Sequence, residues 1–246
     1  MSGHSKWATI KHKKGAADAK RGQIFTKLIK EISIAARMGG GDAESNARLR
    51  TAILKARAAN MPKDNVDRAI KKGTGELEGM SYEELVYEAY APGGVALLIE
   101  VLTDNKNRAA ADVRNILTRA GGSLATAGAV SRLFKRKGII NFDAEKYTED
   151  QIMEAALEGG AEDVASLDGI IEVTTAPEDF EAVLNALNEK NFESMSAEIS
   201  MIPDVEVDMD KDGTAKALRL IEKLEENDDV QNVYNNVAVP DDYEEE

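Results

Sequence analysis

Lysine and arginine side chains are concentrated in the first 72 residues of this 246-residue chain. This segment has 17 Lys and Arg against 6 Asp and Glu, a net formal charge of +11. The rest of the chain has 14 basic and 39 acidic residues, a net of −25. Clustered cations neutralise phosphates and release the counterions that surround a nucleic acid. The charge contrast therefore indicates a nucleic-acid-binding N-terminal region, although the whole chain is acidic.

The candidate contacts are the basic side chains of this region together with one histidine and one tryptophan. Trp7 either stacks on a base or anchors the basic arm to the helices that follow, and the sequence leaves both open. A merely solvated surface is the alternative for the whole set, but the size of the charge excess favours binding. The candidates are Lys6, Trp7, Lys11, His12, Lys13, Lys14, Lys20, Arg21, Lys27, Lys30, Arg48, Arg50, Lys55, Lys63, Lys71 and Lys72.

Lys106 and Arg108 are a second candidate, an anion site at the start of a predicted helix. Free backbone N–H groups at a helix N-terminus favour negative charge. Ordinary helix capping explains the same residues equally well. Neither set of residues predicts a code for reading bases, so backbone binding to duplex DNA or to RNA is equally compatible with the sequence.

Three short amphipathic helices must position the N-terminal cations. Apolar periodicity predicts helices over residues 16–38, 44–59 and 62–72, with the basic side chains turned away from the apolar faces. Gly39 to Gly41 are expected to end the first helix and Gly73 the third, because glycine readily adopts the left-handed conformation of a C-cap. Short helices with brief connections form a small bundle.

After residue 80 the pattern changes to single helices alternating with short strands. We expect a hairpin over 82–102 with a type II turn at Ala91–Gly94, because proline followed by glycine suits that turn. Further strands are expected at 130–142, 170–174, 193–201 and 230–237. Further helices are expected from the 103–108 loop to about 119, and at 148–158, 177–189 and 214–227.

The predicted fold class is α+β: a three-helix bundle followed by two α+β domains of the ferredoxin-like βαβ kind, one inserted in the other. The predicted domains are 1–79 for the arm and bundle, 80–131 plus 204–240 for the split α+β domain, and 132–203 for the inserted domain. Residues 241–246 form an acidic tail.

The sequence contains few residues or motifs that are typical of catalytic or metal-binding sites. The chain has no cysteine, which excludes disulfides, thiolate zinc sites and cysteine nucleophiles, and it has no Gly-Lys pair for a phosphate-binding loop. Asp208 to Gly213 match the first half of a calcium loop, but Lys216 and Arg219 occupy later ligand positions. We interpret that segment as a loop, with Asp212 or Thr214 capping the next helix. We therefore expect no enzyme activity, metal or cofactor.

The chain also has no segment suited to a membrane or to secretion. Its longest apolar run, Val95 to Ile99, is far shorter than the roughly 20 residues of a membrane span, and the N-terminus lacks an apolar signal region. We expect a cytoplasmic protein with a nucleic-acid partner, no membrane association and no small-molecule substrate.

Eight short motifs along the chain resemble the YebC/PmpR family. They are GHSKW at residues 3–7, DAKRG at 18–22, IFTK at 24–27, ANMPK at 59–63, YAPGG at 90–94, LTDN at 102–105, RKG at 136–138 and AEISMIP at 197–203. The resemblance covers nearly the whole chain, and its opening motif is highly specific. It implies a helical bundle and two α+β domains, one inserted in the other.

The resemblance implies two functions that the sequence does not separate. Family members are generally described as probable DNA-binding transcriptional regulators, and mitochondrial relatives are translational activators. Bacterial members have also been linked to ribosomes, where they relieve stalling on proline-rich nascent chains. The first hypothesis is therefore a DNA-binding transcriptional regulator, and the second is a translation factor bound to ribosomal RNA.

Overall fold

The computed structural model describes residues 18–79, 81–167, 169–240 and 243, without the side chains of residues 18–20 and 167. The described chain divides into two compact units. Among the described residues, the first unit takes 18–130 together with 212–233, and the second takes 131–211 together with 234–240 and 243. The α+β fold class predicted from the sequence is confirmed.

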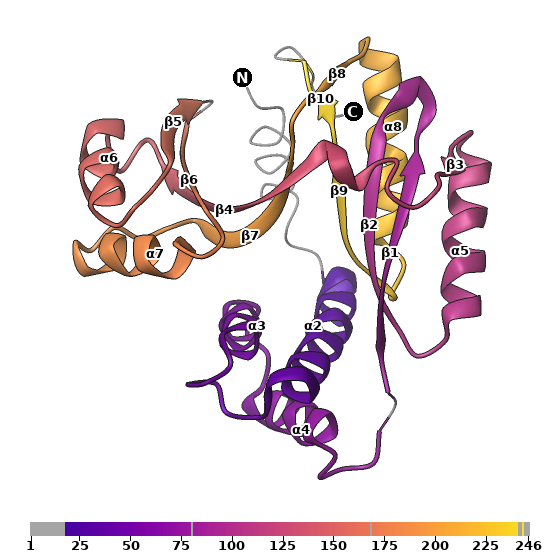
Figure 1. Ribbon diagram of the computed structural model, residues 1–246, viewed down its shortest axis with the longest axis horizontal. Coiled ribbons are helices and arrows are strands. Elements are labelled where there is room, and N and C mark those ends of the chain that lie inside the picture. Colours follow the sequence, from indigo (N-terminus) through magenta and orange to yellow (C-terminus); the bar gives the residue numbers. More distant parts are fainter. Residues whose placement is uncertain (1–17, 80, 168, 241–242, 244–246) are drawn as a thin grey trace. The chain divides into compact units, whose positions relative to one another are not determined.

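The first unit begins with the predicted bundle of three helices, coloured indigo to purple in Figure 1. These are α2 (Asp18–Gly39), α3 (Ala47–Ala58) and α4 (Lys63–Thr74). Their common core is formed by small and branched apolar side chains that recur at helical spacing. The core residues are Ile32, Ala35 and Ala36 of α2, Leu49, Ala52 and Ala56 of α3, Met61 of the connection, and Val66 and Ala69 of α4.

The ends of these helices follow from local chemistry, with one correction. Gly40 takes a φ of 85° directly after α2, as predicted for the glycine run. The prediction that Gly73 ends the third helix was wrong, because α4 continues to Thr74 and Gly75 takes the left-handed C-cap conformation. A Cβ atom on Gly73 would lie 2.2 Å from the carbonyl oxygen of Ser33. Gly73 therefore allows α4 to pack closely against α2.

A four-stranded sheet completes the first unit. Strands β1 (Glu83–Tyr90) and β2 (Ala96–Thr103) form the predicted antiparallel hairpin. Between them, Gly93, with φ 83° and ψ 4°, takes the left-handed conformation that the expected type II turn requires at its third residue. The strand order is β3-β1-β2-β9, with β3 at Ser123–Leu124 and β9 at Val230–Asn235.

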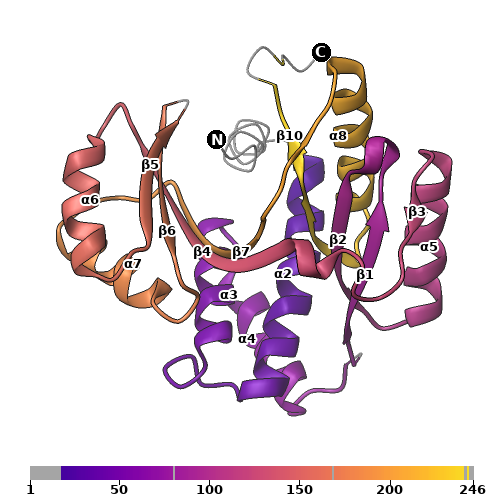
Figure 2. The same ribbon diagram turned by 45° about the horizontal axis from the view of Figure 1, so that its top comes forward.

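Helices α5 (Lys106–Arg119) and α8 (Lys211–Glu225) run alongside this sheet in Figures 1 and 2. Residues before 131 and after 211 thus contribute strands to the same sheet.

The prediction that Asp212 or Thr214 caps α8 was wrong, because α8 begins at Lys211 and contains both residues. Thr214 is buried there, and its hydroxyl has no hydrogen-bond partner among the residues that the structure describes.

The second unit contains the β-α-β-β-α-β sequence of a ferredoxin-like fold. Its elements are β4 (Phe134–Asp143), α6 (Glu149–Glu158), β5 (Asp163–Leu167), β6 (Ile170–Thr175), α7 (Phe180–Glu189) and β7 (Ser196–Pro203). The sheet order is β5-β6-β4-β7 with antiparallel neighbours. A two-stranded parallel sheet of β8 (Val207–Asp208) and β10 (Val237–Ala238) also belongs to this unit.

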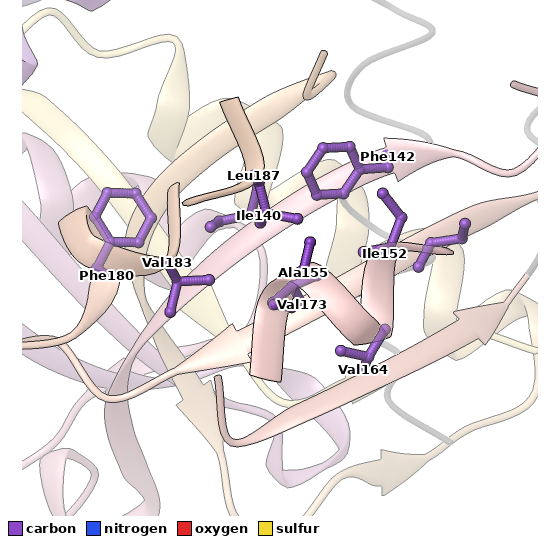
Figure 3. Close-up of a cluster of buried hydrophobic side chains, with 11 residues drawn as sticks. Ile140, Phe142, Ile152, Ala155, Val164, Val173, Phe180, Val183 and Leu187 are labelled. Atoms are coloured by element: carbon purple, nitrogen blue, oxygen red, sulfur yellow. The ribbon is translucent and has the colours of Figure 1, made fainter. Parts of the chain in front are cut away.

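The core of the second unit lies between its four-stranded sheet and helices α6 and α7. Figure 3 shows Ile140 and Phe142 of β4 facing Ile152 and Ala155 of α6 and Val183 of α7. Alternate residues of β4 and of β6 supply this core, as a sheet with one helix-covered face requires. No helix among the described residues is long and apolar enough to cross a membrane.

Candidate nucleic-acid interface

Helix α4 buries one row of residues and exposes several basic side chains around it. Val66 and Ala69 are buried against the bundle core, whereas Lys63, Lys71 and Lys72 are exposed. Val66, Ala69 and Gly73 recur at helical spacing and so define the packed side of the helix, with Gly73 lying against the backbone of α2. Two carboxylates, Asp64 and Asp67, and the guanidinium of Arg68 are exposed on the same helix. The outer surface of α4 is therefore of mixed charge, with cations in excess.

The basic residues of α3 divide into exposed and engaged groups. Lys55 and Arg57 are exposed near the end of the helix. Arg50 donates hydrogen bonds to the carbonyl oxygens of Ala43 and Glu44, at 2.8 and 3.1 Å, and so fixes the loop that enters α3.

Arg48 of α3 is engaged by two carboxylates. Its Nε lies 2.7 Å from a carboxylate oxygen of Glu31, and its Nη2 also pairs with Glu84. Burial lowers the pKa of Arg48, but the hydrogen bonds from these two carboxylates outweigh burial and raise that pKa above its ordinary value. Arg48 thus joins α2, α3 and β1 within the first unit.

The basic face of α2 is directed at the C-terminal end of α8. The Nζ atom of Lys27 donates to the carbonyl oxygen of Glu225 at 2.6 Å, and Gln23 Nε2 donates to that of Glu226 at 2.8 Å. The last carbonyls of a helix lack partners within the helix and carry partial negative charge. Lysine and glutamine of α2 therefore cap α8.

Lys30 of α2 is buried, with 7% of its surface exposed. Its Nζ lies 2.6 Å from Asp229 Oδ1 and 2.8 Å from the carbonyl oxygen of Asp228. A third bond of 3.3 Å reaches the carbonyl oxygen of Leu102, and the ring centroid of Tyr82 lies 5.7 Å away. Lys30 is thus a buried structural cation.

Asp229 is the centre of this buried network. Besides Lys30, it accepts hydrogen bonds from Arg108 Nη2 at 2.8 Å and from Thr103 Oγ1 at 3.0 Å. Burial raises the pKa of Asp229, but the hydrogen bonds from Lys30 and Arg108 outweigh it and place that pKa below its ordinary value.

The second candidate set lies at the start of α5, beside this network. Lys106 forms an ion pair with Glu83, and Arg108 pairs with Asp104 and Asp229. The backbone N–H of Arg108 donates to the side chain of Asn105 at 3.0 Å. Both cations therefore face carboxylates, and one of the N–H groups at the helix start is capped.

A polar pocket of about 480 Å³ opens beside the same network. Five carboxylates line it against two cations, so its electrostatics do not suit an anion. Among the described residues, no group of three or more His, Cys, Asp or Glu side chains is arranged to hold a metal ion. The lining residues are Gln23, Thr26, Lys30, Tyr82, Asp104, Arg108, Asp112, Glu226, Asn227, Asp228 and Asp229.

Some of the remaining residues that were predicted to contact nucleic acid are not described by the structure. Six of them, Lys6, Trp7, Lys11, His12, Lys13 and Lys14, lie outside the described residues. Lys20 lies in α2, but its side chain is not described, and Arg21 is exposed on the same helix. The sequence-based candidate set omitted Arg57 and Arg68, although the helical phase that selected Lys55 and Lys72 places them outside as well.

Comparisons with known proteins cover nearly the whole chain. Residues 5–76 match the family model of the TACO1/YebC protein N-terminal domain, and residues 82–237 match that of the TACO1/YebC second and third domain. The chain is 68% identical to a "Probable transcriptional regulatory protein" of Treponema denticola, over 99% of each chain. A Borreliella burgdorferi protein of the same description is 58% identical, over 98% of this chain and 99% of that one.

A solved structure is also similar. The crystal structure of a conserved hypothetical protein from Aquifex aeolicus superposes with a TM-score of 0.88 at 45% sequence identity. The match covers 98% of this chain and 100% of that chain. With both family models and full-length relatives in agreement, the chain belongs to the TACO1/YebC family.

Proposed function

We propose that this protein is a nucleic-acid-binding regulatory protein, a DNA-binding transcriptional regulator whose interface is the N-terminal arm and bundle. The observation that carries the proposal is the exposure of the α4 lysines on a segment with a net charge of +11. The description of the Treponema and Borreliella relatives as probable transcriptional regulatory proteins supports it.

The proposed interface consists of the arm and the outward cations of the bundle. The arm contributes Lys6, Lys11, Lys13 and Lys14, with Trp7 and His12, from sequence alone. The bundle contributes Arg21, Lys55, Lys63, Lys71 and Lys72, to which the structure adds Arg57 and Arg68. Lys27, Lys30 and Arg48 form contacts within the first unit and so help to hold its helices in place.

The proposed mode of binding is contact with the phosphate backbone. Lysine and arginine contacts to phosphate fix the register and orientation of a protein on nucleic acid without selecting a sequence. The acidic remainder of the chain, with a net charge of −25, repels phosphates and so confines the nucleic acid to the arm and bundle. The proposal assigns no catalytic residue and no cofactor, and it places the protein in the cytoplasm.

The proposal is tested by charge reversal in the arm. We expect Lys11→Glu/Lys13→Glu/Lys14→Glu to abolish binding to a 30-base-pair duplex in fluorescence anisotropy at low salt. The matched control is Arg114→Glu/Lys216→Glu/Arg219→Glu, which makes the same charge change at exposed sites outside the bundle. Equal affinity of the arm variant and the wild type would refute the assignment of the arm.

The competing function, a ribosome-associated translation factor, would use the same cations on ribosomal RNA. Both functions predict salt-sensitive binding, with about 10³-fold of affinity lost between 50 and 200 mM salt when several phosphates are contacted. Sedimentation of cell extracts at low salt separates them. A transcriptional regulator stays out of the ribosomal fractions, whereas co-sedimentation with ribosomes that is lost in the arm variant would favour the translation factor.

A further inference from the structure

A small apolar pocket lies between α2 and α4 on the bundle. It has a volume of about 150 Å³ and is lined by Ile29, Asn65, Arg68, Ala69 and Lys72. Four of these residues stand at positions i, i+3, i+4 and i+7 of α4 and therefore form one stripe along that helix. Ile29 of α2 closes the pocket from the other side.

The lining combines an apolar surface with a polar edge. Ala69 is buried and Ile29 is half-buried, so their carbon atoms supply the apolar part. Arg68 donates to the backbone oxygen of Asp64 at 3.2 Å and to Asn65 Oδ1 at 2.5 Å, which holds its guanidinium on the stripe. The exposed side chain of Lys72 adds a second cation one turn further along.

The size of the pocket selects the kind of group that can enter it. An apolar cavity of about 150 Å³ accommodates a single aromatic ring, whereas whole cofactors occupy sites of about 300 Å³ or more. A planar ring therefore fits the pocket. The two cations at the edge favour a ring carried on an anionic chain.

We infer that this pocket takes one unpaired base of a single-stranded or looped nucleic acid, while Arg68 and Lys72 contact the adjacent phosphates. The inference rests on the proposed function and specifies that the bundle recognises nucleic acid with unpaired bases. Bases of a regular duplex are stacked and paired, so only an unpaired base can leave the stack and enter a side pocket. The planar guanidinium of Arg68 offers a face on which a base can stack.

Charge complementarity favours this occupant over an apolar side chain of a protein partner. Lys63 and Lys71 are exposed on the same helix as the two cations of the pocket. A nucleic acid presents a ring and a negative charge in every repeat unit, which matches an apolar pocket flanked by cations. A protein segment would need one apolar residue surrounded by several carboxylates to match the same surface.

The test compares two 12-residue DNA single strands with the same number of phosphates, one of thymidines and one fully abasic. We expect the wild-type protein to bind the thymidine strand about tenfold more tightly, which is within the range that one stacked base contributes. Asn65→Phe places a ring in the pocket without changing the charge, and we expect it to bind both strands with the wild type's abasic affinity. Ala58→Phe is the control, because Ala58 is exposed on α3 and does not line the pocket.

Two results would overturn the inference while leaving the proposed function standing. The first is equal affinity of the wild type for both strands, and the second is an unchanged thymidine preference in Asn65→Phe. Failure of the wild type to bind either strand or any duplex would instead refute the proposed function. Circular dichroism and the urea midpoint check the fold of each variant, and Asn65→Leu replaces Asn65→Phe if the larger side chain unfolds the bundle.

Discussion

Helices α2 and α4 belong to one bundle and both carry lysines on the face away from its core, yet these lysines have different surroundings. Lys27 and Lys30 of α2 bind carbonyl and carboxylate oxygens at the end of α8 and at Asp229. Lys71 and Lys72 of α4 are exposed. The difference shows that the density of basic residues locates a binding region but does not say which cations are available to a ligand.

The comparison predicts that the α2 lysines determine stability and the α4 lysines determine affinity. The largest expected effect is that of Lys30→Met, which leaves the buried Asp229 with fewer compensating charges. We expect a loss of about 3 kcal/mol in the free energy of unfolding, because removing one partner of a buried ion pair leaves an uncompensated charge. Urea denaturation followed by circular dichroism measures this loss.

The matched control for Lys30→Met is Lys71→Met at an exposed site. Surface substitutions of this kind change the stability by about 0.5 kcal/mol or less. If the two variants unfold at the same urea concentration, then the distinction between α2 and α4 is wrong.

The second expected effect concerns the contact that holds α4 against α2. Gly73→Ala would place a methyl group 2.2 Å from the carbonyl oxygen of Ser33, so the two helices must separate. We expect a loss of about 2 kcal/mol by thermal or urea unfolding. Gly22→Ala in α2 is the control, because a Cβ atom there meets none of the described atoms within 4 Å, and it should stabilise the protein by about 0.5 kcal/mol. Similar stabilities of the two variants would contradict the close packing of α4.

The third expected effect is on affinity alone. Lys71→Glu/Lys72→Glu should weaken duplex binding about tenfold and reduce the salt dependence of binding by about two phosphate contacts. Lys216→Glu/Arg219→Glu makes the same charge change at exposed sites of α8 and should leave both quantities near the wild-type values. Anisotropy titrations between 50 and 200 mM salt give the slope. An equal loss in both variants would mean that net charge, rather than the α4 surface, controls binding.

The smallest expected effect is the pH dependence of stability. The hydrogen bonds from Lys30 and Arg108 keep the pKa of Asp229 below the ordinary value of 3.8 in the folded protein. A carboxylate with a lowered folded pKa contributes stability above its unfolded pKa, and that contribution disappears as the pH falls through the folded pKa. The free energy of unfolding should therefore decrease below about pH 4, and Asp229→Asn should flatten the curve there. A variant curve parallel to the wild-type curve between pH 5 and pH 2 would show that Asp229 does not contribute.

Periodic patterns made most of the fold predictable. The bundle helices, the hairpin and its type II turn follow from apolar spacing and from proline and glycine, which act locally. Strands β3 and β5 were not predicted, because β3 has two residues and the described part of β5 contributes only Val164 to the core. The start of α8 was placed three residues late, because Asp212 and Thr214 resemble capping residues but lie inside the helix.

The candidate site was predictable only where the helix itself determines the surroundings of a side chain. The phase of α4 places Lys71 and Lys72 outside, and the structure agrees. The burial of Lys30 depends on Asp229, 199 residues further along the chain, and no local pattern encodes that pairing. The pocket beside Ile29 likewise exists only because α2 and α4 pack together.

Lys30 and Asp229 are 199 residues apart in the sequence, and this distance has a consequence for folding during synthesis on the ribosome. The sheet that contains β1 and β2 is completed by β9, so the first unit remains unfinished until residue 233 has emerged. The strands and helices of residues 134–203 emerge earlier and have their own core. During translation, Glu225, which binds Lys27, and Asp228 and Asp229, which bind Lys30, are therefore synthesised only after residues 134–203 have emerged and can fold.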